Sequence, residues 1–173
     1  MNTAHLSTYL NDHLAGAIVA LNLIHHLELT YADTKLAPFF AELRSDIQAD
    51  RRDLERLMSR LQISPSRLRI ASAWITQKIS SLKLRIDDST RGPLHLLEAL
   101  EVVGLGIHGK LALWRALIAA ALVSGKLQAI VDYELARRAE EQRQRLEIVR
   151  LECAKAAFAP ASNEASTVAI GAA

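Results

Sequence analysis

A helical stripe of apolar residues, interrupted by one carboxylate, is the feature that most constrains the fold of this chain. Between residues 34 and 61 the stripe positions alternate at spacings of four and three, which is the pattern of a helix with one face in a core. Its members are Leu36, Phe40, Leu43, Ile47, Asp50, Leu54, Leu57 and Leu61. Asp50 therefore faces the core in this phasing. A buried carboxylate is costly unless it is paired and hydrogen-bonded, so Asp50 predicts an internal basic or donor partner, either an arginine or His108.

A second stripe near the C-terminus repeats the arrangement with an amide as its interior exception. Its members are Leu135, Ala139, Gln142, Leu146, Val149, Cys153 and Ala156. Gln142, like Asp50, falls near the middle of its helix. Because an unpartnered polar group taken out of water costs roughly 1 to 3 kcal/mol, the two residues together predict a hydrogen-bonded polar layer.

The rest of the chain reads as helix after helix, without a convincing strand. Half of the 173 residues are apolar and only 5% are aromatic, which suits a single all-α domain with a sizeable core. The periodicity predicts helices over about 4–29, 34–61, 65–84, 93–123 and 126–158, with the start of the last between Lys126 and Asp132. We expect residues 1–158 to form one domain and 159–173 to form a disordered tail.

The lengths of the helices and of their connections predict an antiparallel four-helix bundle. The first two helices are joined by a short loop, as are the last two, so each pair should form a hairpin. The connection between the hairpins is long and contains the shorter helix over 65–84, which favours a crossover. A five-helix up-and-down bundle is the competing arrangement.

Two long helical hairpins joined by a long connection resemble the ferritin-like superfamily. The resemblance covers about residues 4–158, and it is carried by the segments YLNDHLAGAIVALNLIHHL and FFAELRSDIQADRRDLERL. It implies, for an active member, a di-iron centre with Glu on two helices and Glu-x-x-His on the other two. This chain departs from that motif, because Glu42, Asp50, Glu140 and Glu141 are followed three residues later by Ser45, Asp53, Arg143 and Gln144. The resemblance therefore predicts a degenerate, non-di-iron bundle.

Two interpretations of the interior polar residues stay open. Glu101 and His108 flank the main apolar stripe of the helix over 93–123, and either could meet Asp50 across the bundle. Asp50, Glu101 and His108 could then hold a single divalent metal ion such as zinc, iron or manganese. The preferred interpretation has no cofactor: Asp50, Gln142, Glu101 and His108 form a buried polar layer that fixes helix register.

Three glycines within the helix over 93–123 require an explanation, because each costs up to about 1 kcal/mol relative to alanine in a helix interior. They are Gly104, Gly106 and Gly109. A close approach of helix backbones explains them, and so does a small bound molecule. We expect close packing.

The charge, the apolar runs and the single cysteine of the chain limit which partners and which chemistry are expected. The net charge of +2 gives no strong field toward nucleic acid or an anionic membrane. No uncharged apolar run approaches the roughly 20 residues that span a bilayer, so we expect a cytoplasmic protein. Cys153, the single cysteine, lies in an apolar stripe and should be an inert thiol. The alternating Arg and Glu residues over 137–152 predict a solvated surface.

Two classes of function remain. No serine nucleophile, glycine-rich phosphate loop or Cys-x-x-Cys motif is present, so we favour a non-enzymatic bundle that acts through association. A homodimer through an apolar helix face would use Trp74 and Trp114 as its natural anchors. The alternative is a metal-binding or redox stress protein that uses the central layer.

Overall fold

A computed structural model of the chain describes residues 2–66 and 92–159. Of these residues 83% are helical and none forms a strand, which confirms the all-α class. The predicted helix over 65–84 lies outside the described residues except for Pro65 and Ser66, which are not helical. The predicted tail lies outside them from residue 160 onward.

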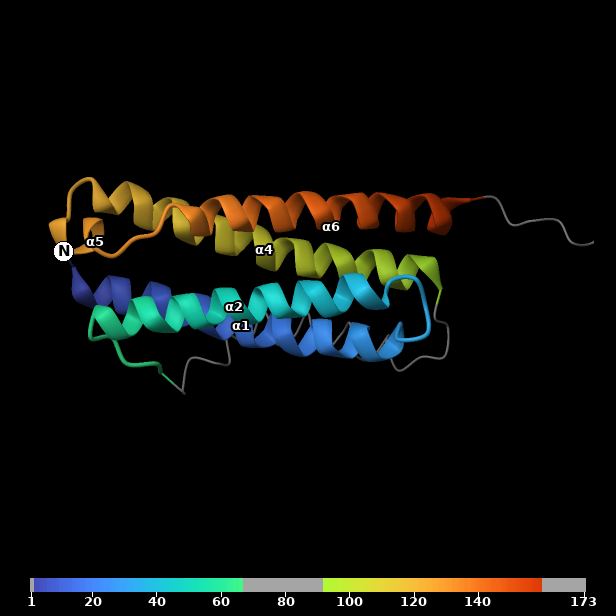
Figure 1. The fold of residues 1–173 in the computed structure, drawn as a ribbon, viewed down its shortest axis with the longest axis horizontal. Coiled ribbons are helices and arrows are strands. Elements are labelled where there is room, and N and C mark those ends of the chain that lie inside the picture. Colours follow the sequence, from blue (N-terminus) through green and yellow to red (C-terminus); the bar gives the residue numbers. More distant parts are fainter. Residues whose placement is uncertain (1, 67–91, 160–173) are drawn as a thin grey trace, which may run out of the picture.

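Four long helices and one short helix make up the described chain. They are α1 (Thr3–Thr30), α2 (Ala37–Arg60), α4 (Pro93–Ala121), α5 (Gly125–Gln128) and α6 (Glu134–Phe158). Figure 1 shows α1 and α2 running side by side in opposite directions, and α4 and α6 doing the same. The antiparallel pairing predicted for the first two helices is therefore confirmed. α1 also packs against α4, which joins the two hairpins.

The order of the helices leaves both predicted topologies open. α2 ends near the beginning of α1, and α4 begins at the opposite end of the molecule (Figure 1). A crossover and a five-helix up-and-down bundle both place the start of α4 there. The segment that distinguishes them, residues 67–91, is outside the described part of the chain.

The helix boundaries follow from local capping chemistry. The Asn2 side chain accepts a hydrogen bond from the His5 amide at 3.1 Å and caps the start of α1. α2 ends where Gln62 adopts a left-handed conformation with φ of 59°. The amides of Gln62 and Ile63 turn back to the carbonyls of Ser59 and Met58, at 3.0 and 2.9 Å, which satisfies the last turn of the helix.

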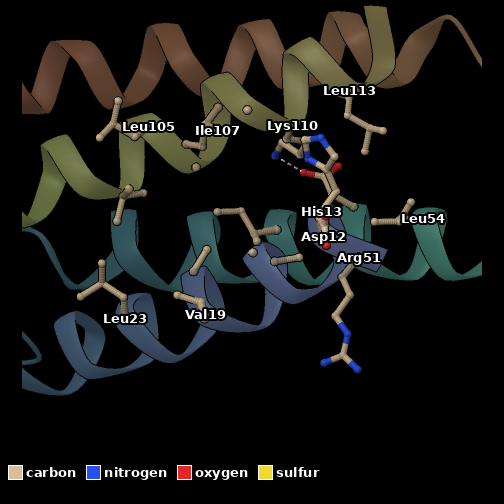
Figure 2. Close-up of a pocket in the computed structure, with 18 of the residues that line it drawn as sticks. Asp12, His13, Val19, Leu23, Arg51, Leu54, Leu105, Ile107, Lys110 and Leu113 are labelled. Carbon is tan, nitrogen blue, oxygen red and sulfur yellow. Dashed lines mark hydrogen bonds and ion pairs between the residues drawn. The ribbon is translucent and has the colours of Figure 1, made fainter. Parts of the chain in front are cut away.

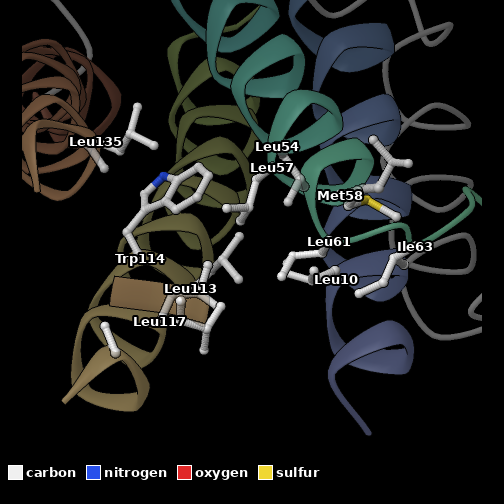
Figure 3. Close-up of a cluster of buried hydrophobic side chains, with 14 of the residues drawn as sticks. Leu10, Leu54, Leu57, Met58, Leu61, Ile63, Leu113, Trp114, Leu117 and Leu135 are labelled. Carbon is white, nitrogen blue, oxygen red and sulfur yellow. The ribbon is translucent and has the colours of Figure 1, made fainter. Parts of the chain in front are cut away.

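The buried side chains form two apolar clusters, one toward each end of the molecule. The first is built around Leu10, Leu14, Leu54, Leu57, Met58, Leu61, Leu113, Trp114 and Leu117, most of which Figure 3 shows. The second is built around Leu23, Ile24, Leu27, Phe40, Leu43, Ile47, Leu100, Val103, Ile107 and Leu146. Asp50, Lys110 and Gln142 each lie in the sequence between members of the first cluster and members of the second. The site described next therefore lies at mid-bundle.

α4 is the most apolar helix of the described chain. By length and composition alone it is the one described helix that could cross a membrane, with a mean hydropathy of 1.4 over its most apolar window. A third of that window is buried inside the protein. The core helix of a bundle meets the same criterion, and α4 packs against both α1 and α6.

Candidate functional site

A hydrogen-bonded ionic layer joins α2, α4 and α6 at mid-bundle. The Asp50 side chain, whose residue is 3% exposed, accepts hydrogen bonds from the Lys110 ammonium, the Arg138 guanidinium and the Gln142 amide. The Arg138 Nε and Gln142 Nε2 atoms lie 2.7 and 2.9 Å from Asp50 oxygens. Lys110 also donates to Gln142 Oε1, which closes a triangle of three side chains. Both carboxylate oxygens of Asp50 thus accept hydrogen bonds, and the amide of Gln142 both donates and accepts one.

Burial shapes the electrostatics of this layer. Removal from water lowers the pKa of the Lys110 ammonium below its usual range, while the Asp50 carboxylate opposes that shift. Burial alone would raise the pKa of Asp53, but hydrogen bonds from Arg138 and Arg56 outweigh it and leave that pKa lowered. Arg138 therefore bridges two carboxylates of α2, Asp50 and Asp53, from its place on α6. The layer is internally neutralised by the cations of the chain itself.

The structure places the four predicted members of the layer in two different environments. Asp50 and Gln142 are buried and in contact, as the phasing of their stripes requires. The prediction that Glu101 and His108 belong to the buried layer is wrong, because both are exposed. Glu101 lies 3.4 Å from Arg150 on α6, in a surface ion pair. The inward position on this part of α4 belongs to Lys110 instead.

This arrangement also removes the proposed ligand set for a metal ion. Asp50, Glu101 and His108 do not converge, since one is buried and the other two face solvent. Within residues 2–66 and 92–159 no three His, Cys, Asp or Glu side chains are grouped as a metal site requires. Lys110 and Arg138 occupy the positions beside Asp50 that a cation would take.

The charged face predicted on α6 is partly a solvated surface and partly a contact with α2. Arg137 pairs with Glu134 and Glu141 within the helix, as the spacing predicted. Arg138 and Arg145 instead reach across to α2, where Arg145 pairs with Glu42 and Asp46. The prediction of a purely solvated face is therefore wrong for these two arginines.

Asn11 forms a second buried polar site, which the sequence analysis did not identify. It is 5% exposed and donates to the Ser7 carbonyl at 2.9 Å. It also accepts from the Ser66 amide and donates to the Ser64 carbonyl at 3.4 Å, so it holds the chain that leaves α2 against α1. The NH2 group and the carbonyl oxygen of the Asn11 side chain are therefore engaged with backbone groups of the chain, which gives Asn11 a structural role.

A pocket of about 350 Å³ lies between α1, α2 and α4, beside the ionic layer. It is lined mostly by apolar side chains, among them Val19, Leu23, Ile47, Val103, Leu105, Ile107 and Leu113. Asp12, Leu105 and Gly106 of its lining are exposed, so the pocket opens to solvent at these residues. Its volume lies at the lower end of the range for small-molecule sites.

The polar residues of the pocket gather near one end. Figure 2 shows Lys110, His13 and Asp12 together, with Leu23, Val19 and Leu105 toward the other end and Leu54 and Leu113 beyond the polar group. Burial lowers the pKa of His13, and the neighbouring Asp12 carboxylate opposes that shift, so the imidazole is largely neutral at pH 7. The pocket is therefore an apolar chamber with a polar end.

Small residues create this space. On α1, the stretch between the core residues Leu14 and Leu23 presents Gly16, Ala17 and Ala20 to the pocket. A Cβ added to Gly16 or Gly109 would have no atom within 4 Å, and one added to Gly106 would meet Ala20 at 3.9 Å. Only Gly104, where an added Cβ would lie 3.3 Å from Leu146, fits the predicted close packing. At Gly109 the expectation of close packing is wrong, because the residue borders open space.

Trp114 and Cys153 are both core residues. Trp114 is 2% exposed and packs in the first cluster, so the prediction that it anchors a homodimer from the surface is wrong. Trp74, the other predicted anchor, lies outside the described residues. Burial, and after it the Glu152 carboxylate, raises the pKa of the Cys153 thiol, which keeps it in the unreactive protonated form.

No protein-family model, curated protein or solved structure matches this chain. The ionic layer and the pocket beside it are therefore the features from which a function can be argued.

Proposed function

We propose that this chain is a non-enzymatic helical-bundle protein that associates with a small apolar molecule in the pocket between α1, α2 and α4. The observation that carries this proposal is the open space at Gly16 and Gly109. Each glycine lies inside a long helix, where alanine would be more stable by up to about 1 kcal/mol and would meet no obstacle. Packing among the residues that the structure describes does not require glycine at either position. In this proposal the space that the two glycines leave open is occupied by the bound molecule.

The chemistry of the lining supports a binding role over a catalytic one. Among residues 2–66 and 92–159, the side chains that line the pocket include no hydroxyl or thiol that could act as a nucleophile. The Asp50 carboxylate is held by donors from three side chains, which leaves it poorly placed to accept a proton from a ligand. What the lining offers is apolar surface and a few hydrogen-bonding groups at one end.

We further propose that the chain is a degenerate relative of the ferritin-like bundles. Two antiparallel hairpins, α1 with α2 and α4 with α6, support that architecture. In this proposal the ammonium of Lys110 and the guanidinium of Arg138 neutralise the interior carboxylate, so the layer needs no metal ion. The layer then fixes the register of α2, α4 and α6.

Elemental analysis tests the proposal for the layer. Protein purified without chelators should contain far less than one transition-metal ion per chain, because Asp50 is already compensated by two cationic side chains. Inductively coupled plasma mass spectrometry gives the metal content directly. A content close to two irons per chain, or close to one tightly held ion that Asp50→Asn releases, would overturn the metal-free assignment.

Filling the pocket tests the binding function. Naphthalene, a bicyclic apolar probe, should bind wild-type protein with one saturable site, followed by its fluorescence or by chemical-shift changes at pocket residues. Gly109→Leu should reduce that affinity at least tenfold, because the new side chain enters the space that the probe needs. The same substitution should leave stability unchanged or increase it, because it removes a helix-interior glycine and buries apolar surface.

Ala112→Leu is the matched control for Gly109→Leu. Ala112 is an exposed residue of α4 outside the pocket. The substitution Ala112→Leu therefore introduces the same leucine side chain on the same helix without placing it in the pocket. Naphthalene affinity should be that of the wild type. The proposal fails if wild-type protein binds no naphthalene, which is the result expected if another part of the chain fills the pocket. It also fails if Gly109→Leu binds naphthalene as tightly as Ala112→Leu does.

A further inference from the structure

The polar end of the pocket carries more information about its occupant than the apolar walls do. Of the twenty lining residues, the charged and imidazole side chains are Asp12, His13, Asp50, Arg51 and Lys110. Four of these belong to ion pairs or other contacts within the protein: Arg51 lies 2.9 Å from Glu55, Lys110 and Asp50 pair with each other, and Asp12 is also engaged. A ligand therefore meets a polar end whose charges are already balanced.

Lys110 nevertheless retains hydrogen-bonding capacity. An ammonium group has three N–H donors and no acceptor. Two of the donors of Lys110 go to Asp50 Oδ2 and Gln142 Oε1, and the third has no acceptor among the described residues. The lysine side chain is only 14% exposed and forms part of the pocket wall. An oxygen atom of a ligand that enters the pocket can accept a hydrogen bond from this third donor.

His13 adds a second polar group at the same end. It comes from α1, opposite Lys110 on α4, and its ring packs edge-on against Tyr9 with centroids 4.6 Å apart. A neutral imidazole offers one donor and one acceptor. Lys110 and His13 thus present hydrogen-bonding groups from two walls, which suits a ligand that ends in an oxygen atom.

The surrounding charges favour an uncharged ligand. A carboxylate or phosphate would have to lose its water beside Asp50 and Asp12, and it would compete with Asp50 for the same ammonium. A hydroxyl or carbonyl oxygen can accept from the third Lys110 donor without disturbing the Lys110–Asp50 pair. The charge balance of the layer then stays intact.

On these grounds we propose that the pocket binds an uncharged amphiphile, with its apolar body toward Leu23 and Leu105 and one hydroxyl or carbonyl oxygen at Lys110. The volume of about 350 Å³ is roughly twice that of a 150 Å³ cavity that holds benzene, so a body of roughly a dozen non-hydrogen atoms fits. This inference rests on the binding function proposed above, and it specifies the chemical class of the ligand.

A series of three probes of nearly equal shape tests the ligand class: naphthalene, 2-naphthol and 2-naphthoate. Wild-type protein should bind 2-naphthol about tenfold more tightly than naphthalene, because the hydroxyl oxygen gains a hydrogen bond to a charged donor. The 2-naphthoate anion should bind more weakly than 2-naphthol. Isothermal titration calorimetry at pH 7 measures all three affinities under one condition.

Variants at the polar end assign the preference to Lys110. The double variant Asp50→Leu with Lys110→Met removes the donor together with its buried counter-charge, and it should bring the ratio of 2-naphthol affinity to naphthalene affinity from about ten down to about one, whatever its affinity for naphthalene. Arg115→Met, which removes an exposed cation of α4 outside the pocket, should keep that preference. If the double variant fails to fold, His13→Phe provides a test that leaves the ionic layer intact and should reduce the preference in part.

The outcomes separate this inference from the function on which it rests. Equal affinity of wild-type protein for naphthalene and 2-naphthol would overturn the oxygen-ended ligand and leave the apolar binding function standing. Tighter binding of 2-naphthoate than of 2-naphthol would overturn the uncharged class. Absence of binding by all three probes would overturn the binding function itself.

Discussion

Asp50→Ala should destabilise the protein by about 3 to 5 kcal/mol, because it leaves the buried ammonium of Lys110 without its counter-charge. The loss extends beyond one ion pair. Arg138 and Gln142 also donate to Asp50, and the amide of Gln142 has its Nε2 atom 2.9 Å from the carboxylate. Chemical denaturation of wild-type protein and Asp50→Ala at pH 7 measures the difference in their free energies of unfolding. The dependence of that free energy on denaturant concentration, the m-value, is taken as equal for both proteins.

The double variant Asp50→Leu with Lys110→Met should recover part of that loss, because the buried ion pair is then replaced as a whole and Lys110 leaves no desolvated charge. Recovery should be incomplete, because the buried Gln142 amide loses both of its partners in this variant. Glu141→Ala removes a carboxylate from an exposed ion pair on α6 and should change stability little, which makes it the matched control. An Asp50→Ala loss no larger than that of Glu141→Ala would show that the interior layer contributes nothing to stability.

The position of Asp50 could be predicted because its helix has one apolar face. On α2 the alternating spacing assigns the inward positions without ambiguity, and all of them from Phe40 to Leu61 are buried. Gln142 follows the same logic on α6. In both helices the opposite face is strongly charged, so only one phasing puts the apolar residues inside.

An arginine partner of Asp50 is confirmed in Arg138, but periodicity does not identify Lys110 as a second partner, because α4 is apolar on more than one side. Leu111, Leu113 and Trp114 are all buried, and a stripe drawn through Leu111 passes beside Lys110. The same spacing of four and three that identifies Asp50 also runs along α4 through Leu96, Leu100, Val103, Ile107, Lys110, Trp114, Leu117 and Ala121. In that phasing Lys110 is the one polar member. The stripe of α2 has one charged member, Asp50, and this stripe of α4 has one charged member of opposite sign, Lys110. The sequence therefore contains enough information to predict that the two residues pair.

The sequence pattern does not predict the contacts of Arg138 or the presence of the pocket. Arg138 lies beside the α6 stripe and reaches Asp50 and Asp53 through its long side chain, which periodicity does not describe. Glycine inside a helix signals that something other than helix propensity selects it, but a glycine at a close helix contact and a glycine beside an open pocket look the same in a sequence. Only the distances around Gly104 and Gly109 separate the two cases.

Trp114→Ala should cost about 3 to 5 kcal/mol of stability, because it empties one of the largest buried volumes in the first apolar cluster. Trp114→Phe should cost much less. The indole Nε1 of Trp114 is buried without a hydrogen-bond acceptor among the described residues, so phenylalanine removes an unpaired donor along with part of the ring. Equilibrium denaturation of both variants, followed by circular dichroism, gives the two values.

The concentration dependence of these measurements distinguishes a core tryptophan from an interface anchor. If Trp114 stabilises the fold within one chain, the loss in Trp114→Ala should be the same at low and high protein concentration, because no association enters the equilibrium. If it instead anchored a dimer, the midpoint of the wild type would rise with concentration and that of Trp114→Ala would not. The burial of Trp114 among Leu57, Leu113 and Leu117 predicts the first result (Figure 3). Any association of this protein would then have to use other residues.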